Sequence, residues 1–156
     1  NLLAYHLPLD AHPTLGNNAQ LGAQLGWVAQ GQFGEQDLGS IGTADFAGAQ
    51  QLAQHVESVL NRPVTLVSTG QSAIKKVAWC TGGAQGYFEA AIAAGADAYI
   101  TGEISEPQAH YAREMGVAYL ACGHHATERY GAPAVAAHVA AALGLRHQFI
   151  DIPNPA

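Results

Sequence analysis

The amino-acid sequence predicts an α/β fold whose sheet is mostly parallel in the C-terminal half. Between residues 76 and 122, short apolar segments alternate with helical patterns in the order strand, helix, strand, helix, strand. That order is typical of right-handed crossover connections on a parallel sheet. A weak internal repeat supports it, because residues 98–103 resemble residues 118–124 with a single insertion. The loops after these strands are therefore expected at one edge of the sheet, where ligands usually bind in α/β proteins.

The elements of the first half follow from local patterns. Amphipathic spacing, an asparagine cap and terminal glycine or proline residues indicate the helices, and apolar runs indicate the strands. In chain order, the predicted elements are a strand over 2–7, a turn-rich loop over 8–13, a helix over 17–26, strand candidates at 27–33 and near Ile41, a helix over 47–60 and a strand over 64–68.

The second half is more regular, and glycine ends most of its helices. The predicted elements are a strand over 76–80, a turn over 81–86, a helix over 87–94, a strand over 98–101, a helix over 106–115, a strand over 117–122, one long helix from His124 to about Leu143, and a last strand over 148–152 that ends at prolines.

The composition narrows the class of protein. The chain has 156 residues, of which 49% are hydrophobic and 12% are charged, with a formal net charge of -6. It offers no basic face for a phosphate backbone, so we expect no direct nucleic-acid partner. The apolar runs are shorter than a membrane span and the first residues lack a signal-peptide pattern, so we expect a cytoplasmic protein with no membrane partner. Few surface charges also favour a homo-oligomer.

Two isolated cysteines, Cys80 and Cys122, each stand at the end of a predicted apolar strand. This usage fits a reduced compartment better than a disulfide scaffold. We expect both side chains to act as small buried hydrophobic groups.

The strongest candidate site follows the strand over 117–122. If a helix begins near His124, then His124 and Glu128 share one helical face. An imidazole and a carboxylate on a common face can bind a divalent metal. Local spacing leaves an alternative open, in which Glu128 interacts with the helix dipole while His124 and His125 are solvated surface residues.

A second group of metal-binding residue types lies near the N-terminus. Asp10 stands between His6 and His12 in a turn-rich segment. Carboxylate and imidazole groups are ligands for several divalent ions. The alternative is structural, since Asp10 could form an Asx turn and His12 directly precedes a proline.

Three further residues fall at the predicted sheet edge. Thr81 and Gly82 precede a helix, where backbone amides attract anions, although the turn lacks both the dinucleotide fingerprint and the lysine of a P-loop. Glu103 follows the next strand and could act as a base or cap the following helix. Thr81, Gly82 and Glu103 are therefore candidate substrate contacts.

Several motifs, taken together and in order, resemble the Nif-three-like family of dinuclear metal proteins, the GTP cyclohydrolase 1 type 2 homologues. They are HLPLDAHP over 6–13, GNN over 16–18, TGEISE over 101–106, GHHATERYG over 123–131 and FIDIPNP over 149–155. The resemblance covers essentially the whole chain. Because the chain starts at Asn1 without an initiating methionine, we expect it to be part of a longer sequence whose N-terminal segment is missing.

The resemblance implies a two-lobed α/β protein, assembled as a toroidal homohexamer with a dinuclear metal centre inside the ring. Residues 1–33 would be the remnant of an incomplete first lobe, residues 34–122 the second lobe, and residues 123–156 the helix and strand that complete the first lobe. Asp10 would bind one metal, His124 the other, and Glu128 would bridge both. The family also uses two adjacent histidines from a segment before Asn1, and these are absent here.

The resemblance further implies two divalent metal ions per chain in full-length members. Carboxylate and imidazole ligands do not distinguish Zn, Fe, Mn, Ni and Mg. The preferred hypothesis is a metal-dependent hydrolase of a small, nucleotide-like substrate, with His6, His12 and His125 as catalytic candidates for proton transfer. Two alternatives remain open, a non-catalytic metal-binding hexameric scaffold and a regulatory interaction protein.

Overall fold

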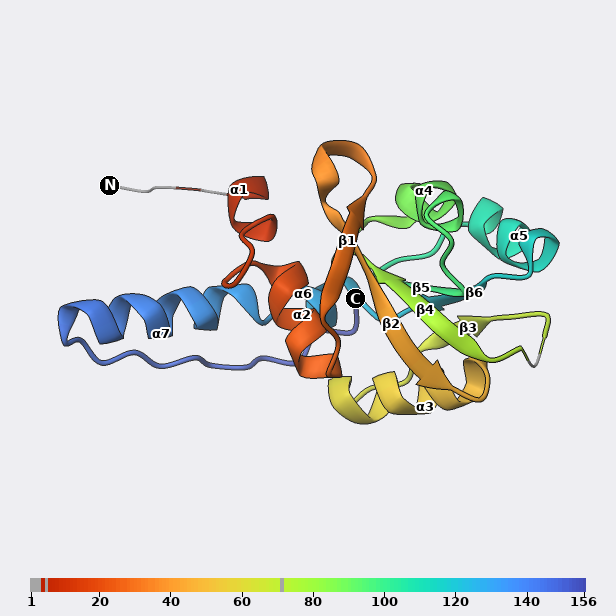
Figure 1. Ribbon diagram of the computed structural model, residues 1–156. Helices are drawn as coiled ribbons and strands as arrows, with labels where there is room; N and C mark the ends of the chain where they lie inside the picture. Colours follow the sequence, from red (N-terminus) through yellow and green to blue (C-terminus); the bar gives the residue numbers. More distant parts are fainter. Residues whose placement is uncertain (1–3, 5, 71) are drawn as a thin grey trace.

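A six-stranded mixed sheet forms the centre of the protein. The computed structural model describes residues 4, 6–70 and 72–156. The strand order is β1-β2-β4-β5-β6-β3 (Figure 1). The strands are β1 (Ala29–Phe33), β2 (Gly39–Phe46), β3 (Thr65–Val67), β4 (Ile74–Trp79), β5 (Ala98–Thr101) and β6 (Ala118–Ala121). Together with helices on both faces of the sheet, this confirms the predicted α/β fold class.

The three central strands are parallel. Val77 of β4 lies opposite Ala98 of β5, and Ala98 lies opposite Ala118 of β6. The outer strands are antiparallel, with β1 on β2, β2 on β4 and β3 on β6. The prediction that the loops after the parallel strands meet at one edge is confirmed.

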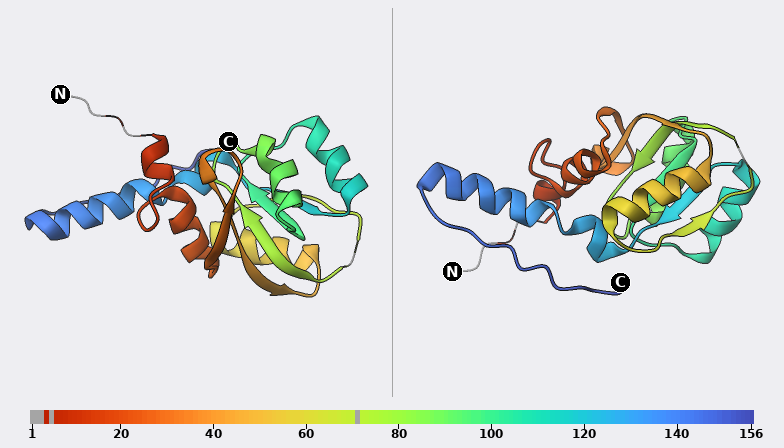
Figure 2. Two further views of the ribbon diagram at one scale, coloured as in Figure 1. Left: turned by 45° about the horizontal axis from the view of Figure 1, so that its top comes forward. Right: turned by 90° about the horizontal axis from the view of Figure 1, so that it is seen from below.

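The helices cover both faces of the sheet (Figure 2). They are α1 (Leu7–Asp10), α2 (Asn17–Leu25), α3 (Ala49–Leu60), α4 (Phe88–Ala93), α5 (Glu106–Met115), α6 (His124–Glu128) and α7 (Gly131–Leu143), with short 3₁₀ turns η1 (Glu35–Asp37) and η2 (Gln85–Tyr87). Because successive strand residues point to opposite faces, Trp79 packs in a core with Leu52 of α3, whereas Tyr99 packs in a second core with Phe88 of α4.

The N-terminal elements differ from the prediction. Residues 2, 3 and 5 of the strand predicted over 2–7 lie outside the described residues, and Leu7 begins α1 instead. The predicted loop over 8–13 contains this helical turn, because Pro8 occupies the first turn, where its missing N–H costs no hydrogen bond. Helix α2 lies where it is predicted, but its N-cap is Gly16, and Asn17 is a buried residue inside the helix.

Two helices replace the single long helix predicted from His124 to Leu143. Helix α6 ends at Glu128 and α7 begins at Gly131. Pro133 explains the break, because proline cannot donate to the carbonyl of Arg129 and its ring crowds that carbonyl. The N–H of Gly131 instead donates to Oδ1 of Asn17 at 2.8 Å.

The last strand, predicted over 148–152, is wrong. These residues belong to the described part of the chain, form no strand there and are exposed. Helix α7 projects away from the sheet, so the tail after it passes no strand edge with which it could pair (Figures 1 and 2). The tail returns to the body, where Arg62 donates to the carbonyls of Pro155 and Ala156 at 3.2 and 3.1 Å. Within the described ranges, none of the helices is long and apolar enough to span a bilayer.

Candidate metal centre

A pocket of about 370 Å³ opens beside the edge where β4, β5 and β6 end. Most of its lining comes from α1, from the segment between β4 and α4, and from α6. The chemically active side chains among its lining residues are His6, Asp10, Cys80, Thr81, His124 and Glu128. The structure therefore brings the proposed metal ligands Asp10, His124 and Glu128 to one pocket, although they are far apart in the sequence.

The sharp turn at Gly123, with φ of 94°, directs the chain from β6 into α6. His124 and Glu128 lie on one face of this helix, with Nε2 of His124 3.1 Å from Oε2 of Glu128. The Thr127 hydroxyl fixes the neighbouring turn, since it accepts a hydrogen bond from the N–H of Gly82 at 3.0 Å. This turn and the ligand helix are thus held together as one unit.

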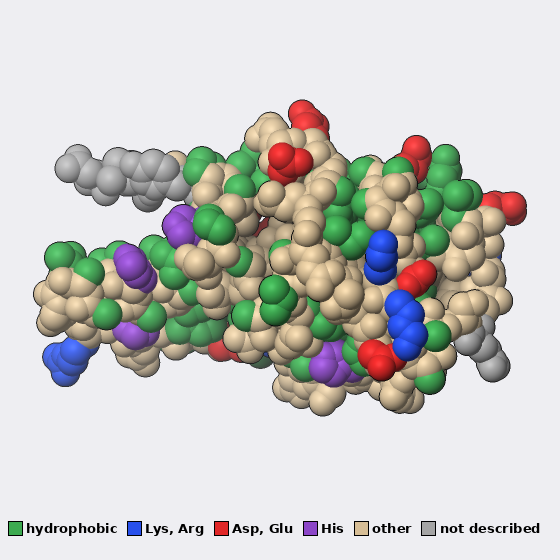
Figure 3. Space-filling model, in the orientation of Figure 1, with side chains coloured by type: hydrophobic (Ala, Val, Ile, Leu, Met, Phe, Trp, Pro, Cys, Tyr) green, Lys and Arg blue, Asp and Glu red, His purple; other side chains and the backbone are tan. Residues whose placement is uncertain are grey.

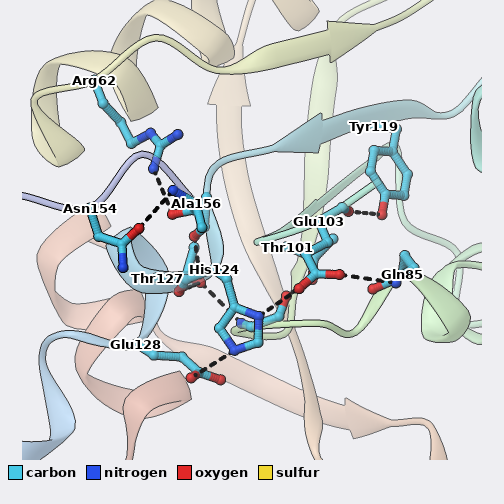
Figure 4. A network of polar contacts seen from close by, with 12 residues as sticks. Arg62, Gln85, Thr101, Glu103, Tyr119, His124, Thr127, Glu128, Asn154 and Ala156 are labelled. Carbon is cyan, nitrogen blue, oxygen red and sulfur yellow. Dashed lines mark hydrogen bonds and ion pairs between the residues drawn. The ribbon is translucent and has the colours of Figure 1, made fainter. Parts of the chain in front are cut away.

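Glu103 contacts the other nitrogen of His124 (Figure 4). Nδ1 of His124 lies 2.7 Å from Oε1 of Glu103, and Nε2 of Gln85 donates to Oε2 of Glu103 at 3.3 Å. The hydrogen bond with Glu103 raises the pKa of His124 above its usual value of 6.5, and the Glu128 carboxylate adds to this. The same hydrogen bond lowers the pKa of Glu103 below 4.5.

Asp10 reaches the pocket from the last residue of α1. Nδ2 of Asn17 donates to Oδ1 of Asp10 at 2.8 Å, while Nε2 of His6 lies 3.6 Å from Oδ2 of Asp10. The Asp10 side chain is mostly buried, whereas that of His6 is 84% exposed. Asp10 is therefore fixed in direction, and His6 stands at the solvent side of the pocket.

Two asparagines at the start of α2, predicted only as part of a helix start, connect the site to the fold. Asn17 bonds both Asp10 and the first residue of α7. Oδ1 of Asn18 accepts a hydrogen bond from the N–H of Thr81 at 2.7 Å, and its carbonyl accepts one from Nε1 of Trp79 at 3.0 Å. Local spacing does not reveal these roles, since each joins segments that are distant in the chain. Their occurrence together, next to the Asp10 loop, is the signal that the sequence carries.

Gly82 leaves the space in front of the ligand pair open. Its φ is 68°, a conformation that favours glycine. A Cβ at this position would overlap the Glu128 carboxylate and lie 3.1 Å from Nε2 of His124. Thr81 is buried and points its backbone toward Asn18, so its N–H is already paired.

The other candidate histidines lie outside this pocket. His12 lines a neighbouring cavity of about 540 Å³ that shares Asp10 with it, and its Nδ1 accepts a hydrogen bond from the N–H of Leu15 at 3.1 Å. His125 lies 3.9 Å from Asp151 and lines a separate pocket between α6 and the tail, and its buried Nε2 has no hydrogen-bond partner among the described residues. Neither histidine lines the pocket that holds Asp10 with the His124 and Glu128 pair.

The donor set fits a divalent cation in type. Carboxylate and imidazole groups face the pocket, and Gly82 leaves room between them. Burial raises the pKa of Cys80 to about 11, so its thiol stays protonated at neutral pH. Within residues 4, 6–70 and 72–156, no three His, Cys, Asp or Glu side chains lie close enough to hold an ion by themselves. The described residues therefore supply a His–Glu pair with Asp10 across the pocket.

Comparison with known proteins gives consistent matches. Residues 1–155 match the Duf34/NIF3 (NGG1p interacting factor 3) family. The chain is 52% identical over 159 residues to the GTP cyclohydrolase 1 type 2 homolog of Neisseria meningitidis serogroup B, and 50% identical over 162 residues to that of Pseudomonas aeruginosa. Both alignments cover 100% of this chain and 63% of the relative, so the chain spans less than two thirds of these relatives.

Comparison with solved structures also gives matches over the whole of this chain. A protein described as ybgI, of unknown function, is 46% identical and has a TM-score of 0.92. Protein TTHA1606 from Thermus thermophilus is 30% identical, with a TM-score of 0.82. The matches cover all of this chain and 63% and 62% of those chains, respectively.

Proposed function

The chain belongs to the Duf34/NIF3 family, as its motifs predict, and from that premise we propose that it is a divalent-metal-binding protein that acts as a hydrolase on a small, nucleotide-like substrate. Asp10, His124 and Glu128 would be its protein ligands. The names of its relatives, GTP cyclohydrolase 1 type 2 homologues, support the nucleotide-like substrate class.

One observation carries the metal-binding proposal. Asp10 and the His124–Glu128 pair come from segments at opposite ends of the chain, yet they line a single pocket of about 370 Å³. Ordered hydrogen bonds hold them there, through Asn17 for Asp10 and through Glu103 for His124. Hydrogen-bond partners of this kind fix the direction of groups that ligate a metal.

The chemistry would divide between the ions and the chain. When bound, divalent ions supply Lewis acidity, which polarises a substrate oxygen and acidifies water. His6 stands at the pocket entrance with an exposed imidazole, so it can exchange a proton with a bound substrate. Leu7, Leu38 and Tyr87 line the same pocket and give it an apolar wall.

Other properties of full-length family members come to this chain only as proposals. They are two ions per chain, a toroidal homohexamer and a cytoplasmic location. The chain spans 63% of the curated relatives that it matches, so the second ion would depend on the pair of histidines that the family supplies from an earlier segment.

Metal content tests the proposal. The protein is loaded with zinc, desalted and measured for zinc per chain by elemental analysis. We expect bound zinc in the wild type, and loss of most of it in Glu128→Ala. Glu106→Ala is the matched control, because the Glu106 carboxylate is exposed on α5 and should leave the zinc content unchanged.

A second form carries the N-terminal segment of the Neisseria meningitidis relative in front of residue 1. We expect it to approach about two ions per chain. Zinc-dependent turnover on a panel of nucleotides, phosphoesters and peptides would support the hydrolase. Absence of zinc from both forms would refute the metal centre.

A non-catalytic interaction protein is the second candidate. The family name describes an interacting factor, and the exposed apolar residues of α7 and the tail offer a surface for a partner. Tight zinc binding without turnover on any substrate of the panel would favour this function over the hydrolase.

A further inference from the structure

His124 has a carboxylate at each of its two ring nitrogens. Nδ1 lies 2.7 Å from Oε1 of Glu103, and Nε2 lies 3.1 Å from Oε2 of Glu128. A neutral imidazole has one N–H and one lone pair, so only one of its nitrogens can bind a metal ion. The carboxylate that accepts a hydrogen bond from the ring N–H therefore decides which nitrogen has its lone pair free for a metal ion.

Glu103 is the better anchored of the two carboxylates. Its second oxygen accepts a hydrogen bond from Gln85, and its main-chain carbonyl accepts one from the buried Tyr119 hydroxyl at 2.6 Å (Figure 4). Gly83 lies beneath the carboxylate, and a Cβ there would come within 3.4 Å of Oε1. Glu103 is thus held from η2, from β6 and from the turn after β4.

Glu128, by contrast, is held mainly through His124. It lies on the same short helix, four residues later, and lines the pocket itself. No other hydrogen bond fixes its carboxylate within the described part of the chain. Its carboxylate is free to turn toward a cation, whereas that of Glu103 is already held between His124 and Gln85.

We infer that Glu103 is a positioning residue. Its carboxylate accepts a hydrogen bond from Nδ1–H of His124 and so leaves the Nε2 lone pair of His124 directed into the pocket beside Glu128. The inference rests on the proposed metal-binding function. It gives Glu103 a task different from the substrate contact that the sequence predicted. Carboxylates that hold the outer nitrogen of a ligand histidine orient the ring and strengthen metal binding in the same way.

Zinc affinity provides the first arm of the test. We expect Glu103→Ala to weaken zinc binding about 10- to 100-fold in a chelator competition, which is the usual cost of losing such a partner. Glu103→Gln should weaken zinc binding less, because its amide oxygen can still accept a hydrogen bond from Nδ1–H of His124. Glu106→Ala, at an exposed position of α5, should bind zinc as the wild type does. Thermal unfolding of each variant checks that it is folded.

The position of the ring proton provides the second arm and needs no metal. Nitrogen-15 spectra of the histidine rings are recorded on the metal-free protein, at a pH high enough to neutralise the imidazole. We expect the proton of His124 on Nδ1 in the wild type and in Glu103→Gln, and a shift toward Nε2 in Glu103→Ala. A merely structural Glu103 would not move this signal.

The outcomes separate the inference from the function that it rests on. A wild-type proton on Nε2, or an Ala variant with unchanged zinc affinity and unchanged ring proton, would overturn the role of Glu103 while the metal centre stands. The ring proton could instead leave Nδ1 only in Glu103→Ala while the protein binds no zinc. This result would support the role of Glu103 and refute the proposed function.

Discussion

His124 and Glu103 form an ion pair in the metal-free protein, and its effect on stability should depend on pH. The pKa of His124 is raised in the fold, so its contribution is complete below 6.5 and is lost as the pH rises through the folded-state pKa. The pKa of Glu103 is lowered, so its contribution is present above 4.5 and is lost as the pH falls through the folded-state pKa. The pair is therefore most stabilising between these two values.

We predict that Glu103→Gln lowers the urea midpoint of the metal-free protein more at about pH 5.5 than at about pH 9. The difference should be small, since both side chains are more than two-fifths exposed, and it should shrink at high salt. Urea unfolding with a chelator present measures it, and Glu106→Gln serves as the control. An equal loss at both pH values would contradict the ion pair.

The residues of the candidate site differ in how far the sequence could predict them. Asp10, His124 and Glu128 belong to motifs that carry the resemblance, and the structure places them around one pocket. The task of Asn17 was not predictable, because it bonds Asp10 and Gly131, and a local pattern indicates only a helix cap there. Second partners of this kind depend on tertiary structure, which brings distant segments together.

At the level of elements, the edge of the sheet depends on glycines that allow three backbone segments to approach. A Cβ on Gly102, directly after β5, would lie 2.6 Å from the carbonyl oxygen of Gly82 and 2.7 Å from the Cα of His124. Both contacts are with backbone atoms, which cannot turn away as a side chain can. The strand end, the turn after β4 and the start of α6 therefore move together.

We predict that Gly102→Ala lowers the free energy of unfolding by about 1–3 kcal/mol, the usual cost of overpacking, and reduces zinc retention because His124 is displaced. Gly86→Ala is the matched control, because no described atom lies within 4 Å of a Cβ there. Urea unfolding and zinc content measure the two effects. A Gly102→Ala protein as stable as Gly86→Ala would show that this edge is looser than the structure indicates.

The elements show which patterns suffice for prediction. The strands β5 and β6 were predictable because each is a short, mostly buried run that directly follows a glycine-terminated helix. The break between α6 and α7 was missed, although Pro133 was visible, because the apolar pattern continues through it. The last strand failed for a different reason, since a strand requires a partner edge that the sequence of the strand does not specify.

The molecule as a whole has an unusual outline, with α7 extending from the body and the tail running back from the end of α7 toward the body (Figures 1 and 2). Hydrophobic side chains lie along this projection in the space-filling view (Figure 3). The exposed large apolar residues of α7 and the tail are Val139, Leu143, Leu145, Phe149, Ile150 and Ile152. Leu143 is 67% exposed and Ile150 69% exposed, far more than the core positions. The division into two lobes stays a prediction.

Such an apolar projection should associate with other surfaces in water. We predict that the 156-residue chain forms concentration-dependent oligomers, because association removes apolar surface from solvent. The apolar surface that stays exposed should bind the dye ANS. Light scattering coupled to size-exclusion chromatography, at several protein concentrations, measures the mass. Leu143→Glu should lower both the mass and the dye fluorescence, since it replaces an exposed apolar side chain with a charge.

His138→Glu is the control for added charge alone, because His138 is an exposed polar residue of the same helix. It should leave the mass near that of the wild type if the apolar surface drives association. A wild-type chain that stays monomeric at every concentration and binds no dye would refute the prediction. Equal effects of the two variants would assign association to charge on α7 instead of its apolar side chains, and the homo-oligomer expected from the low charge content would then need a different surface.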